Sequence, residues 1–251
     1  MPALTNNAAV SPPTPVGYAT MSSALPLAGN YHRWLLQLIR PHLRGQGLEI
    51  GFGYGQYTTE LAASLKRLVA VDCDPELAGK MPPMPANVDF VLADLLDPGF
   101  PEKVGAETFD SVVCLNVLEH IEQDGLALKN IRDCLRPGGC LLLVVPAHPA
   151  LFGPMDALAG HWRRYTRQGL TEKLLAGGFM PRELYYLNPL GGLGWWVNAK
   201  LFKPRTLSDA SVNRQILWFD RYIQPLSRLL SPVTRAFFGQ SLWALARKPD
   251  S

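Results

Sequence analysis

Seven short runs of mostly apolar residues recur along the chain, and each has a length that suits one strand. They lie at 47–50, 68–72, 88–92, 110–115, 140–145, 180–187 and 241–247. The segments between the first five runs are long enough for helices, and alternating strands and helices are typical of a parallel sheet covered on both faces. The pattern therefore predicts an α/β fold, a doubly wound, mostly parallel seven-stranded sheet.

Two helices are marked by apolar spacing or by end signals. The segment 30–40 has apolar residues at helical intervals. Those that share one face are Trp34, Leu35, Leu38 and Ile39. The segment 166–177 starts at Thr166, a favourable N-cap residue, and ends at a pair of glycines. We expect a helix over each segment.

The connection 188–239, before the last predicted strand, is long for a loop, and long connections are commonly functional. Apolar residues recur there in steps of about four and three, which predicts amphipathic helices. They are Val212, Ile216, Phe219, Ile223, Leu226, Leu230, Val233 and Phe237. Four arginines spaced by seven lie roughly opposite, namely Arg214, Arg221, Arg228 and Arg235. Pro225 and Pro232 predict kinks, with a new helix starting at 231–232.

Two interpretations of this connection stay open. It is either a helical cover packed on the rest of the domain, with solvated arginines, or a surface at 211–237 that contacts an anionic membrane or a lipid-linked molecule. The glycine- and tryptophan-rich stretch 191–196 precedes it and favours a pocket wall or a hinge, with simple packing as the rival interpretation.

Composition narrows the class of protein. A length of 251 residues and a hydrophobic content of 47% suit one domain at 21–251, after a Pro- and Ala-rich tail at 1–20 that we expect to be flexible. Apolar runs are too short to span a bilayer and the N-terminus lacks a signal-peptide pattern, which predicts a cytoplasmic protein, either free or peripheral at the inner membrane face. The four cysteines have no metal or redox spacing. A net charge of +3 is too weak for a nucleic-acid interface, although 203–251 holds eight Lys and Arg against three Asp.

The sharpest chemical signal follows the first predicted strand. That strand contains Glu49 and is followed by three alternating glycines, Gly51, Gly53 and Gly55. Such a turn lets a ligand approach the backbone at the start of a helix. A dinucleotide fingerprint would need its third glycine where Gln56 stands, so this turn departs from it. The next two strands are followed closely by Asp72 and Asp94, at the sheet edge where ligands bind.

These motifs resemble class I S-adenosylmethionine-dependent methyltransferases. The resemblance covers about 40–150 and rests on the glycine turn, the two aspartates, Asn116-x-x-Glu119-His120 and Arg136-Pro137-Gly138-Gly139. It implies a Rossmann-like methyltransferase fold and S-adenosyl-L-methionine as cofactor. Glu49 and the glycines would shape the methionine end, Asp72 would accept the ribose hydroxyls, and Asp94 would meet the adenine amino group. The other residues that the resemblance places at the cofactor are Tyr31, Cys73, Leu95, Leu115, Asn116 and His120. A weaker likeness at 30–31, 160–165 and 239–242 is to a bacterial branch of type 11 or 12 methyltransferase domains.

Candidate residues for the methyl acceptor lie later in the chain. His148 follows the fifth predicted strand, and His161 lies in a basic loop; either is a candidate general base, because histidine titrates near neutral pH. The candidates for acceptor binding are His148, His161, Arg164, Tyr165, Trp195 and Trp196. In quinone-pathway O-methyltransferases an E-x-x-E-H pattern can hold a metal, but Asn116 takes the first place here, so we expect no required metal.

The sequence therefore predicts methyl transfer to oxygen or nitrogen of a small, partly apolar molecule, of the kind found in secondary metabolism. Two alternatives stay open: an acceptor that is a lipid-linked or cell-envelope intermediate, and a methyltransferase-fold module that binds without catalysis. The identity of the acceptor and the oligomeric state are not determined by these patterns.

Overall fold

The fold is built on one seven-stranded sheet in the order β3-β2-β1-β4-β5-β7-β6. The computed structural model describes residues 27–78, 83–201 and 210–250, so the predicted tail at 1–20 lies outside the described residues. The strands are β1 (Gln46–Ile50), β2 (Arg67–Asp72), β3 (Val88–Leu92), β4 (Phe109–Leu115), β5 (Leu135–Pro146), β6 (Met180–Leu187) and β7 (Ser241–Arg247). Only β7 runs antiparallel to its neighbours among these strands, which confirms the predicted doubly wound, mostly parallel sheet.

The predicted strands agree with the observed ones to within a residue or so, except at β5. That strand begins at Leu135 instead of 140, because the segment 136–139 forms a bulge between the pairs Phe109–Leu135 and Ser111–Cys140. Gly138 in the bulge has a φ of 71°, which a glycine adopts without strain. The bulge is secured to β7, since Gly138 N donates to Lys248 O at 3.1 Å.

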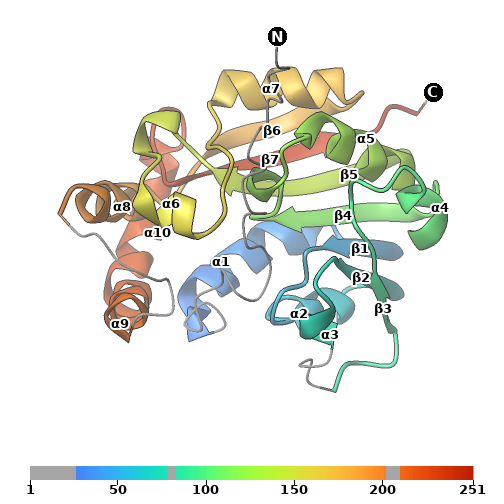
Figure 1. Ribbon diagram of the computed structural model, residues 1–251, viewed down its shortest axis with the longest axis horizontal. Helices are drawn as coiled ribbons and strands as arrows, with labels where there is room; N and C mark the ends of the chain where they lie inside the picture. Colours follow the sequence, from blue (N-terminus) through green and yellow to red (C-terminus); the bar gives the residue numbers. More distant parts are fainter. Residues whose placement is uncertain (1–26, 79–82, 202–209, 251) are drawn as a thin grey trace, which may run out of the picture.

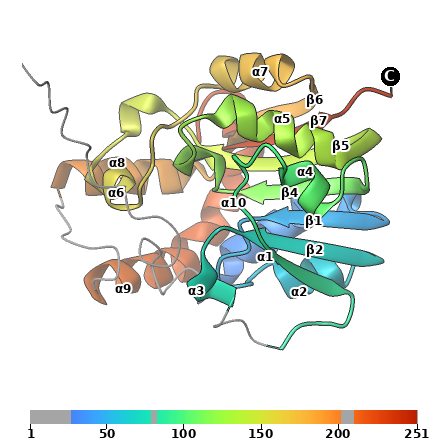
Figure 2. The ribbon, with the colours of Figure 1, turned by 45° about the vertical axis from the view of Figure 1, so that its right-hand side comes forward.

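Helices cover both faces of the sheet (Figures 1 and 2). They are α1 (Gly29–Ile39), α2 (Thr58–Ala62), α3 (Pro75–Ala78), α4 (Phe100–Val104), α5 (Asp124–Cys134), α6 (Pro154–Leu158), α7 (Arg167–Ala176), α8 (Pro189–Leu201), α9 (Ala210–Trp218) and α10 (Gln224–Thr234). The two predicted helices correspond to α1 and α7. Thr166 caps α7 as expected, accepting the amide hydrogen of Gly169 at 2.9 Å.

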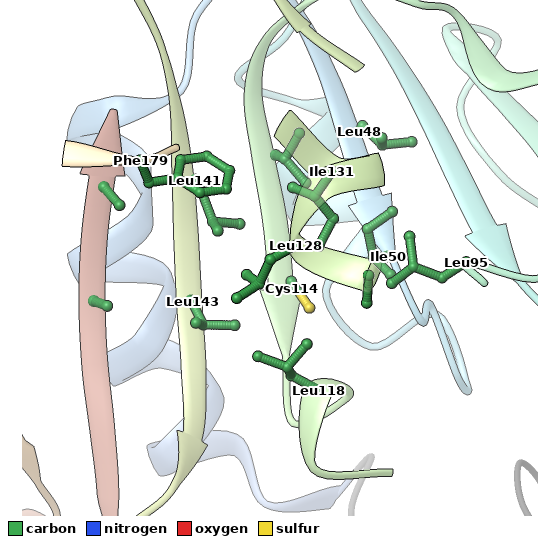
Figure 3. Packing of buried hydrophobic residues seen from close by; sticks show 14 of the residues in the cluster. Leu48, Ile50, Leu95, Cys114, Leu118, Leu128, Ile131, Leu141, Leu143 and Phe179 are labelled. Atoms are coloured by element: carbon green, nitrogen blue, oxygen red, sulfur yellow. The ribbon is translucent and has the colours of Figure 1, made fainter. Parts of the chain in front are cut away.

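Alternate residues of each strand supply two separate cores. Along β5, Leu141 and Leu143 join the core under α4, α5 and α7, whereas Leu142 and Val144 join the core under α1 and α2. Figure 3 shows the first of these cores, with Leu128 of α5 packed among strand residues. Burial on both faces explains why these strands are continuous apolar runs in the sequence.

The described parts of the connection 188–239 are mostly helical, and helices α8 and α9 lie beyond the end of the sheet toward which β4 points (Figures 1 and 2). A π-helical turn, Phe219–Ile223, joins α9 to α10. The predicted new helix start at 231–232 is wrong, because α10 continues through Pro232. The helix survives there because Arg235 N still donates to Ser231 O at 2.8 Å.

Helix α10 turns its polar side toward the protein. Gln224, Ser227 and Ser231 are buried, whereas Val233 is 75% exposed and Phe237, just after the helix, 64% exposed. An inward-facing apolar stripe is therefore not what attaches this helix. Hydrogen bonds do so, since Ser227 Oγ donates to Asn188 Oδ1 at 2.7 Å and accepts from Leu190 N at 3.1 Å.

Asp220, in the π-helical turn, fastens the same connection to α1. Its carboxylate accepts from the amides of Asn30 and Tyr31, both at 2.9 Å, and its carbonyl accepts from Asn30 Nδ2 at 2.7 Å. An acid at a helix N-terminus satisfies amides that have no partner within the helix. The connection is thereby held beside the carboxyl ends of the strands.

Candidate active site

One large cavity, of about 1410 Å³, opens between the carboxyl ends of the strands and the helical connection. The predicted site residues that line it are Tyr31, Gly51, Gly53, Asp72, Cys73, Asp94, Leu95, Leu115, Asn116, His120, His161, Arg164 and Trp195. Its far wall comes from α8, α9 and the π-helical turn, through residues such as Trp218 and Phe219. The cavity exceeds the roughly 300–1,000 Å³ of a pocket for one small ligand, so it has room for two.

The glycine turn forms one end of this cavity. Gly51, Gly53 and Gly55 have φ values of 72°, 54° and 73°, in the left-handed region that favours glycine. A β-carbon at Gly51 would lie only 2.4 Å from a methyl carbon of Val117. The turn therefore leaves backbone, rather than side chains, at the cavity surface.

Two acids lie beside this turn in different environments. Asp72 accepts from the amides of Gly53 at 3.2 Å and Asp74 at 3.1 Å, and burial raises the pKa of its carboxyl although these hydrogen bonds oppose the shift. Glu49 is buried behind the turn, where desolvation raises its pKa to about 8. Among the described residues, Glu49 Oε2 has no hydrogen-bond partner. An acid with an unused acceptor atom can take a donor from a ligand at little cost.

The other end of the cavity carries a cluster of Glu119, His120 and His161, whose ligand atoms lie within 4.8 Å of one another. Glu119 and His120 come from the 3₁₀ turn after β4, and His161 comes from the loop after α6. Burial raises the pKa of Glu119 to about 7 and lowers that of His120 to about 4. The cluster lies just past Asn116, at the carboxyl end of β4.

Asp156, which is fully buried, organises the surroundings of this cluster. One carboxylate oxygen lies 2.9 Å from His161 Nδ1 and accepts from Arg164 Nε at 2.8 Å. The other accepts from Gly153 N at 2.9 Å and from Trp195 Nε1 at 3.2 Å. Burial alone would raise the pKa of Asp156, but these hydrogen bonds and the Arg164 charge outweigh burial and lower it. Asp156 thus fixes His161, Arg164 and Trp195 relative to one another.

The sequence of the central region agrees with a known family. The methyltransferase domain family matches residues 48–143. A tRNA U34 carboxymethyltransferase of Azotobacter vinelandii is 34% identical over 44% of this chain. The mitochondrial ubiquinone biosynthesis O-methyltransferase of Schizosaccharomyces pombe is 33% identical over 38% of it. In both cases this chain covers 36% of the length of the curated relative. A solved S-adenosylmethionine-dependent methyltransferase from Mesorhizobium loti shares the fold with a TM-score of 0.60, at 15% identity over 88% of this chain and 99% of that one.

Residues 48–143 therefore resemble a methyltransferase domain. The chain resembles class I S-adenosylmethionine-dependent methyltransferases in motif order and in fold, and this resemblance implies S-adenosyl-L-methionine as its cofactor.

The methyltransferase domain fits this cofactor at the glycine-turn end of the cavity. Backbone at Gly51 and Gly53 borders the cavity, and the carboxylates of Asp72 and Asp94 line it as possible acceptors for hydroxyl and amino donors. The residues that would hold the cofactor are therefore Asp72, Asp94 and the turn itself, with Glu49 behind the turn. Tyr31 closes this end from α1, with its hydroxyl hydrogen-bonded to Ser241 and its pKa raised by burial to about 12.

Five predicted site residues do not line the large cavity. Glu49 and Gly55 lie behind it and shape the turn. His148 is stacked on Tyr186 with ring centroids 4.7 Å apart, so the structure separates it from the acceptor end. Trp196 is 51% exposed and points away from the wall, unlike its neighbour Trp195.

The fifth, Tyr165, has a structural role. Its buried hydroxyl lies 3.0 Å from Asp124 Oδ2, and Asp124 also accepts from Arg163 at 3.0 Å and Lys173 at 2.6 Å. Arg164 lines the cavity but is already paired with Asp156. Both guanidinium groups of this loop have carboxylate partners, which leaves them less available to pair with an anionic acceptor.

Sequence reasoning missed Asp156, Asp220 and the participation of Glu119. Asp156 lies in the short helix α6, five residues before His161, and no periodic pattern marks the contact between their side chains. Glu119 belongs to a motif of the resemblance, but only the fold brings His161 to it. The grouping of a buried acid with two histidines is visible only in the three-dimensional structure.

Proposed function

We propose that this chain transfers the methyl group of S-adenosyl-L-methionine to oxygen or nitrogen of a small, partly apolar acceptor. The observation that supports this most is a single cavity with the glycine turn and strand-end acids at one end and Glu119, His120 and His161 at the other. When bound, the cofactor supplies an electrophilic methyl group on a sulfonium ion, so the protein needs chiefly to position the acceptor and exclude water.

The roles follow from the positions of the side chains. Asp72 and Asp94 bind the nucleoside part, and the glycine turn admits the methionine part. The Glu119–His120–His161 cluster takes up the proton that an oxygen or nitrogen acceptor loses. Trp195, fixed by Asp156, gives the acceptor an apolar wall, which favours a partly apolar molecule.

A transfer assay with methyl-labelled cofactor tests this function. The chain is incubated with panels of phenols, carboxylates, amines and hydroxylated quinone precursors, and label in the organic extract is counted. Transfer to one class, lost in Asp72→Ala, supports the proposal. Cofactor binding without transfer to any of these classes favours the alternative of a binding module.

A second candidate is an acceptor held in or on a membrane. It is favoured by the outward apolar side of α10, where Leu229 is 73% and Val233 75% exposed. Side chains of this kind gathered on one surface commonly mark an interaction site. In the described parts of the chain, the helices are all too short or too polar to cross a bilayer, so contact would be peripheral.

Vesicle co-sedimentation distinguishes this candidate. Anionic phosphatidylglycerol vesicles should retain the chain at low salt and release it at high salt, and Val233→Glu should prevent retention. Leu175→Glu, on the exposed side of α7 and away from α10, is the matched control. If all three proteins sediment to the same extent, the outward side of α10 does not contact the membrane, and this candidate is rejected.

A further inference from the structure

We propose that Glu119, His120 and His161 bind a divalent transition-metal ion at the acceptor end of the cavity. Two imidazoles and one carboxylate form a donor set that suits Zn²⁺, as in catalytic zinc sites that keep one position open. Ion binding itself does not depend on the proposed function, because it is a property of these three side chains. The expectation from the sequence was the opposite, since Asn116 takes the place of a carboxylate.

The distances suit an ion better than a hydrogen bond. Glu119 Oε1 and His161 Nε2 are 4.0 Å apart, beyond hydrogen-bond range, and the two imidazole rings meet edge to face with centroids 4.7 Å apart. Donors around a tetrahedral ion at about 2.1 Å are separated by roughly 3.4 Å. The three ligand atoms lie within 4.8 Å of one another, so contractions of at most about 1.4 Å would complete the site.

One of the two histidines has its second nitrogen committed to a partner. His161 Nδ1 lies 2.9 Å from Asp156 Oδ1, which leaves Nε2 facing Glu119. His120 lies beside the backbone of Gly160 and Ala159, whose carbonyls favour a proton on its ring. Carboxylate and backbone partners of this kind orient the imidazoles of metal sites and fix the tautomer that presents a lone pair to the ion.

Glu119 has a buried atom that the described protein leaves unpartnered. Its Oε2 has no hydrogen-bond partner among the described residues, and the residue is only 1% exposed. A buried carboxylate oxygen without a partner is costly, so such an atom calls for an explanation. A cation between Glu119 and the two histidines supplies one, and the backbone that carries them is held by Trp162 N donating to Glu119 O at 2.8 Å.

The position of the ion gives it a role in the proposed function. The three residues border the cavity beside Asn116, so an open coordination position would face the acceptor. A metal-bound hydroxyl is more acidic than a free one, so with the ion bound its proton would pass to solvent water, and the three ligands would not themselves act as the base. This role, unlike ion binding, rests on the proposed function.

The test is metal binding by the full chain after treatment with a chelator. Co²⁺ replaces Zn²⁺ as a visible probe, titrated with and without competing Zn²⁺. We expect one ion per chain and a visible absorption band of low-symmetry Co²⁺ that Zn²⁺ abolishes. Glu119→Gln and His161→Ala should each weaken Co²⁺ binding by about 100-fold or more. Removing a residue that only orients a ligand costs about 10- to 100-fold in metal affinity, so removing a ligand should cost at least the larger value. His42→Ala, a histidine outside the cavity wall, is the matched control and should bind as the parent does.

Circular dichroism and binding of S-adenosylhomocysteine establish that each variant is folded. If a variant does not fold, the wild-type stoichiometry and the competition by Zn²⁺ still decide the proposal. Less than about one ion per five chains, or equal binding by the parent, Glu119→Gln and His161→Ala, would overturn it. Methyl transfer by a metal-free chain would overturn only the role of the ion in catalysis, whereas ion binding without any methyl transfer would count against the proposed function alone.

Discussion

The two ends of the cavity are built in different ways. At the cofactor end, Asp72 and Asp94 lie at or just after the ends of parallel strands, and the turn that carries the glycines is continuous in sequence. At the acceptor end, His161, Arg164 and Trp195 meet through Asp156. Local patterns therefore define the first end, and long-range hydrogen bonds define the second. Substitutions at the acceptor end should therefore disturb the cofactor end little, whereas substitutions at the cofactor end should disturb the acceptor end more.

The largest effect should come from filling the glycine turn. Gly53→Val places a branched side chain at a φ of 54° and at the cavity surface, so cofactor binding should be lost, by at least about 100-fold. Calorimetry with S-adenosylhomocysteine measures this. Gly125→Val is the matched control, because a β-carbon at Gly125 meets no other atom within 4 Å. Equal affinity in both variants would place the cofactor elsewhere.

The next effect separates the two candidate histidines. His161→Ala should lower kcat by about 10²–10⁴ while the cofactor Kd stays unchanged, since His161 lies at the acceptor end only. His148→Asn should retain kcat, because His148 is stacked on Tyr186 outside the cavity and Asn accepts its φ of 60°. Steady-state kinetics with the identified acceptor measures both. The reverse ranking would mean that the loop after β5 carries the chemistry.

A smaller effect should distinguish adjacent tryptophans. Trp195 lines the cavity and donates to Asp156, whereas Trp196 is half exposed. Trp195→Ala should raise the acceptor KM by about 10-fold, from the loss of roughly 1–2 kcal/mol of apolar contact. Trp196→Ala should change it little. Equal increases in the acceptor KM from both substitutions would contradict the claim that Trp195, and not Trp196, forms the wall of the acceptor site.

The smallest effect concerns the cofactor end without its ligand. Burial raises the pKa of Glu49 from its usual 4.5 to about 8, so the folded chain holds a proton that the unfolded chain releases between these values. The free energy of unfolding should therefore fall as pH rises from about 4.5 to 8, and this part of the slope should vanish in Glu49→Gln. Urea denaturation at several pH values measures it. Glu102→Gln, at an exposed acid, should keep the parent slope.

Most of the fold could be predicted because the sheet is buried on both faces. Continuous apolar runs mark β1, β2, β4, β5 and β7, and their helices have helical spacing or capping signals. The bulge in β5 could not be placed, because the turn residues 136–139 do not show that pairing starts before them.

The acceptor end was less predictable for a physical reason. The apolar spacing of α10 indicates a helix but not which side faces inward, and buried hydrogen bonds from Ser227 reverse the usual choice. Likewise, His161 and Glu119 are 4.0 Å apart in space but far apart in sequence. Contacts that depend on the path of an irregular loop leave no periodic trace.

The most direct test of the two-ended cavity is calorimetric titration of S-adenosylhomocysteine into the parent, Asp72→Ala and His161→Ala proteins, side by side. Asp72→Ala should weaken binding by roughly 1–3 kcal/mol, through lost hydrogen bonds to a charged group, and His161→Ala should leave the affinity within about twofold of the parent. One binding site per chain with this ranking supports the account. Unchanged affinity in Asp72→Ala, or equal losses in the two variants, would contradict it.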